Sequence, residues 1–307
     1  MNNTLLHKEK FKHLKNEHAT YNLPKAIIFA CGATLSVSLM SFFVKLTNSN
    51  IGESTQLFFR FAISFIYILV FLGIRKLQGK KTAIKPRQIS LHFVRAVSSF
   101  LAIFTLFITV RHISLVDAYL LGASNQIFVA LFTMLIYKTK YNSKIWLGIA
   151  CAFFGVTSIL KPDMQIFNYS ALCGLASGMF TAVSLLSGQQ LNKENKIHAI
   201  IFNYFLLTFI FSVIIVVFHW QTPNTHELLL LIAIGIFGTM YQDFIMRSLT
   251  YAAAYTISPL LYLSVVHSVF LGWIFLGDIP DIFSLIGAVL ICGGNIYIIK
   301  LSAKASQ

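Results

Sequence analysis

The residues of this chain that could carry chemistry are ionisable side chains inside long apolar stretches. Five groups have this setting: Glu53, Arg60, Arg95, Asp243 and His267. A charge in hydrocarbon costs at least ~2.5 kcal/mol on insertion scales, so such a side chain normally faces a cavity or a partner. We therefore expect these five to bind a solute, to carry protons or to join helices.

Three polar residues of one stretch share a helix face, because Glu53, Gln56 and Arg60 follow i, i+3, i+7 spacing. The pattern predicts a gate that recognises a zwitterion or an anion. It is equally typical of an internal structural ion pair, since both roles require the same face.

Arg95 also has two interpretations. Its planar guanidinium could hold a substrate carboxylate in a bidentate arrangement. The simpler interpretation is that the long side chain extends to the membrane interface or binds a structural partner, which requires no ligand.

Asp243 and His267 are candidates for proton coupling, because carriers use such residues in proton relays. Asp243 lies beside Gln242, and it could also bind a cationic group of a substrate. The alternatives are structural: Asp243 could pair with Arg247 at i+4, and a neutral histidine bonded to a serine or a carbonyl is the commoner case.

Neutral polar groups could complete a cavity for an organic solute or could join neighbouring helices. They fall in three of the apolar stretches and are Asn125, Gln126, Asn203, Tyr204, Tyr255, Ser258 and Tyr262. We predict that Arg60, Asn203, Gln242 and Tyr262 border one central polar cavity. The small residues Gly174, Ser177, Gly178 and Thr181 are expected to serve close helix packing instead.

Ten apolar stretches must position these groups, and each is about long enough to cross a bilayer as a helix. They run near 25–46, 54–74, 89–110, 114–136, 144–160, 169–190, 197–218, 228–249, 252–276 and 282–299. Pro259 removes one backbone donor and predicts a kink in the ninth stretch.

The lysines and arginines lie in alternate gaps between the stretches. If the N-terminal tail is cytoplasmic, 19 of the 24 fall on the cytoplasmic side, 3 on the other side, and Arg60 and Arg95 within spans. This is the positive-inside bias, and it predicts that both termini are cytoplasmic. The net charge is +14, but the basic residues are distributed by membrane side and do not form one patch. We therefore do not expect a nucleic-acid partner.

Composition and motifs exclude several classes of protein. A chain that is 57% hydrophobic and 11% charged is too apolar for an ordinary soluble domain. We find no nucleotide-binding GxxxxGK[ST] loop, no HExxH and no GxSxG, so we expect neither an enzyme nor a catalytic residue. The four cysteines have no metal-ligand spacing, and we expect no metal and no cofactor.

The second half of the chain repeats the first. WLGIACAFFGVTSIL and LIGAVLICGGNIYII match in their glycines, which pairs Gly148 with Gly287 and Gly155 with Gly294. Five spans repeat as five, and because five is odd the second copy enters the membrane from the opposite side. Inverted repeats of this kind build many secondary transporters, with the substrate site between the halves.

The same residues carry a resemblance to a known family. GESTQLFFRF, VRAVSSFLAIFTLFITVRHISLVDAYLL, SPLLYLSVVHSVFLGWIFLGD and the span-closing GAVLICGG resemble EamA-type members of the drug/metabolite transporter superfamily. The Arg-Ala pair at 95–96 and the RHISLVDA segment are similar to the branch of S-adenosylmethionine uptake transporters. The resemblance implies an all-helical membrane carrier.

We therefore predict an all-α polytopic membrane protein of ten transmembrane helices in two inverted five-helix repeats. The predicted parts are a basic cytoplasmic tail at 1–24, repeats at 25–161 and 162–300, and a cytoplasmic tail at 301–307. The predicted function is secondary transport of a small organic metabolite, such as an amino acid or an amino-acid derivative, across a bacterial inner membrane by alternating access. The family resemblance adds S-adenosylmethionine as a cargo. The prediction is compatible with a homodimer. The alternative is a flippase for a lipid-linked intermediate or a non-transporting membrane scaffold.

Overall fold

The structure is a computed structural model of the 307-residue chain. It describes residues 22–47, 51–79, 86–137, 147–148, 150–151, 154–155, 158, 169–252, 257–277 and 281–305. Throughout these residues the regular structure is helical. The principal helices are α2 (Leu23–Leu46), α3 (Glu53–Leu77), α4 (Ile89–His112), α5 (Leu115–Gly122), α6 (Asn125–Tyr137), α8 (Tyr169–Glu194), α9 (Ile197–Val216), α10 (Thr225–Tyr251), α12 (Leu263–Leu271) and α13 (Ile282–Ala305).

Seven segments are long and apolar enough to cross a membrane, judged by length and composition. They are α2, α3, α4, the α5–α6 segment over Leu115–Thr133, α8, α9 and α10. The predicted apolar stretches coincide with these helices, so an all-helical membrane-type fold is confirmed. Much of the predicted stretch 144–160 lies outside the described residues, and the count of ten spans stays a prediction.

Two of the predicted stretches are interrupted helices. The fourth breaks between α5 and α6 at Ala123 and Ser124. The ninth begins as a 3-10 helix, η1 (Ser258–Tyr262), continues as α12 and ends as a π-helix, η2 (Gly272–Leu276). Pro259 lies at the start of η1, where its missing N–H is best tolerated, which agrees with the predicted irregularity.

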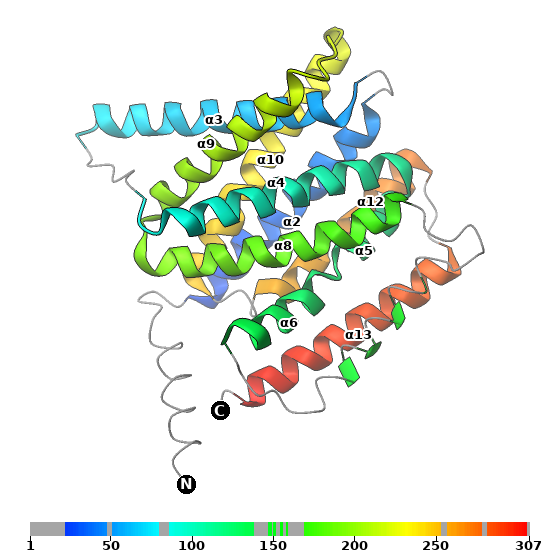
Figure 1. Cartoon of the computed structure of the whole chain (residues 1–307). Coiled ribbons are helices and arrows are strands. Elements are labelled where there is room, and N and C mark those ends of the chain that lie inside the picture. Colours follow the sequence, from blue (N-terminus) through cyan, green and yellow to red (C-terminus); the bar gives the residue numbers. More distant parts are fainter. Residues whose placement is uncertain are drawn as a thin grey trace.

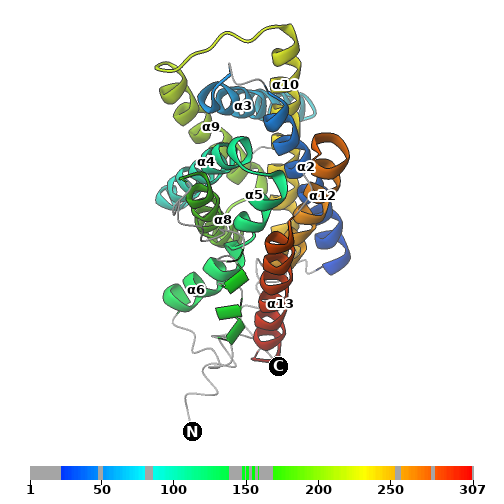
Figure 2. The ribbon, with the colours of Figure 1, turned by 90° about the vertical axis from the view of Figure 1, so that its right-hand side faces the viewer.

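The helices form one bundle in which four members are central. Figures 1 and 2 show α3 and α13 at opposite ends, with α2, α4, α8 and α10 between them. The most extensive packing joins α2 with α10 and α4 with α8, and α3 packs against both α9 and α10. The candidate site lies among these central helices.

Small side chains allow the central helices to approach closely. On α8, a Cβ at Gly174 would lie 3.0 Å from Leu121 Cβ, and Ser177 Oγ donates to the Ala102 carbonyl of α4 at 2.9 Å. On α10, Ser248 Oγ donates to the Ala26 carbonyl of α2 at 2.8 Å. The bilayer core contains no water to hydrogen-bond these hydroxyls. Because each hydroxyl instead donates to a carbonyl of a neighbouring helix, it joins the two helices and is itself satisfied.

The contact of α3 with α10 depends on Gly235, and this gives a test of the packing. A Cβ at Gly235 would lie 2.3 Å from Ile63 Cδ1 and 2.7 Å from Ile63 Cβ. We expect Gly235→Val to lower the stability by about 1–3 kcal/mol, because overpacking forces these helices apart. Gly73→Val on α3 is the control, since nothing lies within 4 Å of a Cβ there. Thermal unfolding of purified protein measures both; equal melting temperatures for the two variants would contradict the described packing.

Candidate functional site

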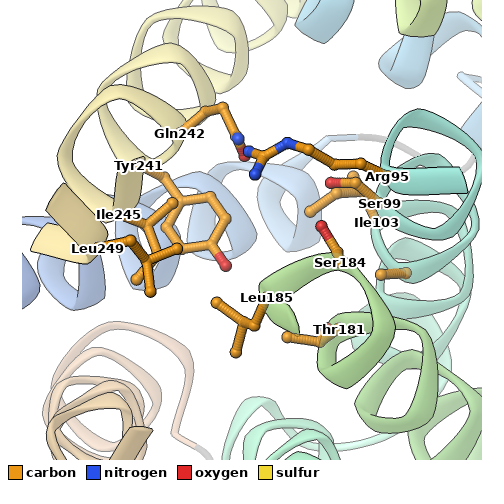
Figure 3. Close-up of a pocket in the computed structure, with 11 residues that line it drawn as sticks. Arg95, Ser99, Ile103, Thr181, Ser184, Leu185, Tyr241, Gln242, Ile245 and Leu249 are labelled. Carbon is orange, nitrogen blue, oxygen red and sulfur yellow. The ribbon is translucent and has the colours of Figure 1, made fainter. Parts of the chain in front are cut away.

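A small polar cavity lies among α4, α8 and α10 (Figure 3). Its polar lining is Arg95, Ser99, Thr181, Ser184, Tyr241 and Gln242. Its apolar lining is Ala102, Ile103, Leu185, Ile245 and Leu249. The cavity volume is ≈ 20 Å³, which is room for about one or two water molecules. In this conformation the cavity is too small for an organic molecule and must widen before it can hold one.

Arg95 supplies the charge of this cavity. The side chain is 2% exposed, and its Nε has no hydrogen-bond partner among the described residues. Its guanidinium carbon lies 5.2 Å from the ring centroid of Tyr204 on α9, a cation–π contact. No carboxylate lies within ion-pairing distance of Arg95 in the part of the chain that the structure describes.

The neighbours of Arg95 fix its position. A Cβ at Gly188 of α8 would lie 2.1 Å from one terminal nitrogen of the guanidinium, so only a glycine leaves room for this rotamer. Ser99 and Tyr204 share a hydrogen bond of 2.9 Å between their hydroxyls, which holds the Tyr204 ring against Arg95. Contacts with α8 and α9 thus position the guanidinium of α4 before any ligand is present.

Gln242 faces Arg95 from α10. Figure 3 shows the ends of the two side chains pointing toward one another across the cavity, with the Tyr241 and Ser184 hydroxyls below them. Gln242 is 3% exposed, and its Nε2 has no hydrogen-bond partner among the described residues. An unpaired buried amide is costly in a low-dielectric interior. The cavity lining therefore offers two donors without partners among the described residues and contains no acid.

The three polar residues predicted to share one face of α3 do not form a common site. Arg60 is fully buried and donates to Ser64 Oγ at 2.9 Å and to the Gly238 carbonyl at 2.8 Å, outside the cavity lining. Glu53 instead forms an ion pair of 3.3 Å with Arg111 of α4. Gln56 is buried, and neither of its amide atoms has a partner in the part of the chain that the structure describes. A role of these three residues in binding stays a prediction.

The two residues predicted to couple protons lie apart from the cavity lining. Asp243 points toward Arg247 and accepts two hydrogen bonds from its guanidinium, at 2.6 and 3.3 Å. This is the structural pair that the i+4 spacing allows. His267 on α12 has a buried Nδ1 without a partner among the described residues. Proton coupling by either residue stays a prediction.

The remaining predicted residues do not gather at this cavity. Asn203 Nδ2 donates to the Ala199 carbonyl of its own helix at 2.7 Å. Tyr262 on η1 contacts the break between α5 and α6, where its hydroxyl lies 3.5 Å from the Ala123 carbonyl. Asn125 lies at the same break, and its Oδ1 is buried without a partner among the described residues. Tyr255 lies outside the described residues.

Two of the nine predicted binding residues, Arg95 and Gln242, thus line this cavity. The sequence alone did not indicate the other polar residues of the lining, which are Ser99, Ser184 and Tyr241. Thr181 was expected to serve helix packing. The only available signal was spacing, since Ser99 follows Arg95 at i+4 and Tyr241 precedes Gln242.

The comparisons with known proteins agree with a membrane carrier. The model of the EamA-like transporter family matches residues 24–161 and 168–300. The chain belongs to this family. It is therefore a multi-pass membrane protein of a family of transporters, not of enzymes.

Individual relatives of this EamA-like transporter are distant. It is 26% identical over 271 residues to the pseudopaline exporter CntI of Pseudomonas aeruginosa, covering 88% of this chain and 94% of that protein. It is 28% identical over 255 residues to an S-adenosylmethionine uptake transporter of Rickettsia conorii, covering 81% and 83%. A solved crystal structure aligns with a TM-score of 0.66 over 93% of this chain and 100% of that chain at 15% identity, a likeness of fold.

The two buried arginines give a test of the site, because they differ in their partners. Arg60→Met is expected to lower the stability by about 1–3 kcal/mol, since it removes two charge-assisted hydrogen bonds. Arg95→Met is expected to leave the stability unchanged or to raise it, because it removes a buried charge whose guanidinium makes no comparable hydrogen bonds with the described residues. Thermal unfolding in detergent compares them. A larger loss for Arg95→Met than for Arg60→Met would show that Arg95 has a structural role.

Proposed function

We propose that this protein is a secondary carrier that moves a small organic metabolite across the bacterial inner membrane by alternating access. The central substrate site is the cavity among α4, α8 and α10. The observation that carries the proposal is this cavity, on which polar side chains converge from three membrane-type helices, with the Arg95 Nε and the Gln242 Nε2 unpartnered among the described residues. Such groups are costly in a bilayer, and a binding site is the ordinary reason to maintain them.

The pairing of the helices supports a carrier built from two equivalent halves. If 25–161 and 162–300 are repeats, α2 and α4 of the first half correspond to α8 and α10 of the second. Exchange of the halves then converts the α2–α10 pair into the α8–α4 pair, and these are the two most extensive contacts of the bundle. This exchange relation favours inverted repeats with the site between them.

The functions of the relatives narrow the class of cargo but leave the direction of transport open, because they include an exporter and an uptake transporter. One relative is an exporter of pseudopaline, and another is an uptake transporter of S-adenosylmethionine. We propose an amino-acid derivative or S-adenosylmethionine as the cargo. Both termini are proposed to be cytoplasmic, from the distribution of basic residues between the spans.

The proposal is tested by transport into proteoliposomes that contain the purified protein. Saturable uptake of labelled S-adenosylmethionine or of an amino acid is expected. Ser184→Leu is expected to reduce that uptake at least ~10-fold, because the larger side chain projects into a cavity that must widen around the cargo. Ser90→Leu is the matched control, since Ser90 is exposed on α4 and lies outside the cavity lining.

Two results would contradict this proposal. Uptake by Ser184→Leu equal to that of Ser90→Leu would mean that the cargo bypasses the cavity. Absence of solute transport, together with exchange of labelled lipid between the leaflets, would favour the flippase alternative.

A further inference from the structure

Arg95 is the arginine of the cavity lining, and its guanidinium has neither an acidic nor a backbone partner among the described residues. Arg111 pairs with Glu53, Arg247 pairs with Asp243, and Arg60 donates to the Gly238 carbonyl. Arg95 makes a cation–π contact with Tyr204, and that ring carries no formal charge. Arg60 and Arg75 also lack a carboxylate partner among the described residues, but both are hydrogen-bonded and neither lines the cavity.

The cavity lining reinforces this imbalance. None of its eleven residues is an aspartate or a glutamate, and Arg95 is its charged member. The Gln242 Nε2 adds a second buried donor without a partner among the described residues, and it faces the guanidinium (Figure 3). Two donors that converge from α4 and α10 are suited to a group that only accepts hydrogen bonds and carries negative charge.

The position of Arg95 is also fixed in advance, which favours recognition over a flexible interfacial role. Gly188 admits the guanidinium between α4 and α8, and the Tyr204 ring holds it from α9. Its 2% exposure in the structure gives no sign of a side chain that reaches the membrane surface. A preorganised guanidinium binds a planar acidic group at little further entropic cost.

We propose that the transported metabolite carries a carboxylate, and that Arg95 binds this carboxylate with the Gln242 amide donating beside it. The inference rests on the proposed carrier function and names the class of its cargo. Binding neutralises the buried guanidinium, so the loaded site carries no net charge from this pair. A cationic metabolite without a carboxylate is excluded by repulsion from Arg95.

The experiment begins with an unbiased probe. The purified protein in lipid nanodiscs is incubated with a bacterial cytosolic extract, washed and analysed for retained small molecules by mass spectrometry. Wild type is expected to retain a metabolite that carries a carboxylate. Arg95→Gln is expected to retain it about 10- to 100-fold less, the range for a lost charge-assisted hydrogen bond. Arg247→Gln is the control, because that arginine is already paired with Asp243.

The decisive comparison is between the retained metabolite and its methyl ester, in which the carboxylate charge is removed. Wild type is expected to bind the ester about 10- to 100-fold more weakly than the acid, and Arg95→Gln to bind the two alike. Arg95→Lys is expected to give an intermediate ratio, because it keeps the charge and loses the bidentate geometry. Size-exclusion profiles and thermal unfolding establish that each variant is folded, and the acid-to-ester ratio is independent of the amount of active protein.

The possible failures are distinguishable. Retention of metabolites that lack a carboxylate, or equal wild-type affinity for acid and ester, overturns the carboxylate assignment and leaves the carrier function standing. An unchanged acid-to-ester ratio in Arg95→Gln overturns the role of Arg95 alone. Wild-type nanodiscs that retain nothing contradict both this inference and the proposed function.

Discussion

A guanidinium buried among membrane-type helices without an acidic partner is the constraint around which the centre of this protein is organised. A charge of this kind is expensive in hydrocarbon, and a fold can maintain it only by supplying room, an aromatic surface and neighbouring dipoles. Gly188 supplies the room for Arg95, and Tyr204, held by Ser99, supplies the aromatic surface. The described residues supply no carboxylate to Arg95, and the proposed cargo provides that negative charge.

A second constraint, the lipid surroundings, accounts for the small residues at the contacts of the central helices. Without a hydrophobic force between helices in lipid, close contact and interhelical hydrogen bonds must hold the bundle together. Ser177 and Ser248 provide such bonds across the two most extensive helix pairs, and Gly235 and Gly238 admit Ile63 and Arg60 of α3.

The sequence alone predicted the helices well, because hydropathy reports directly on segments that cross a bilayer. The predicted stretch 89–110, for example, became α4 over Ile89–His112. The site was harder to predict, since the side of a helix that faces a cavity is set by packing and not by hydropathy. Asn203 and Tyr204 show the difficulty: successive residues point about 100° apart on a helix, and Tyr204 is the one that contacts Arg95. The glycine that makes room for Arg95 could not be found from composition, because its role depends on a residue 93 positions away in the chain.

The central claim is that one cavity is reached alternately from the two sides of the membrane. It is tested most directly by a single cysteine at Ser184, in a chain whose four natural cysteines are replaced, with a membrane-impermeant maleimide applied to either face of uniformly oriented vesicles. The account predicts that the cysteine is labelled from both faces, and that saturating cargo slows labelling from each. Labelling from one face only, or at a rate that cargo leaves unchanged, would contradict it.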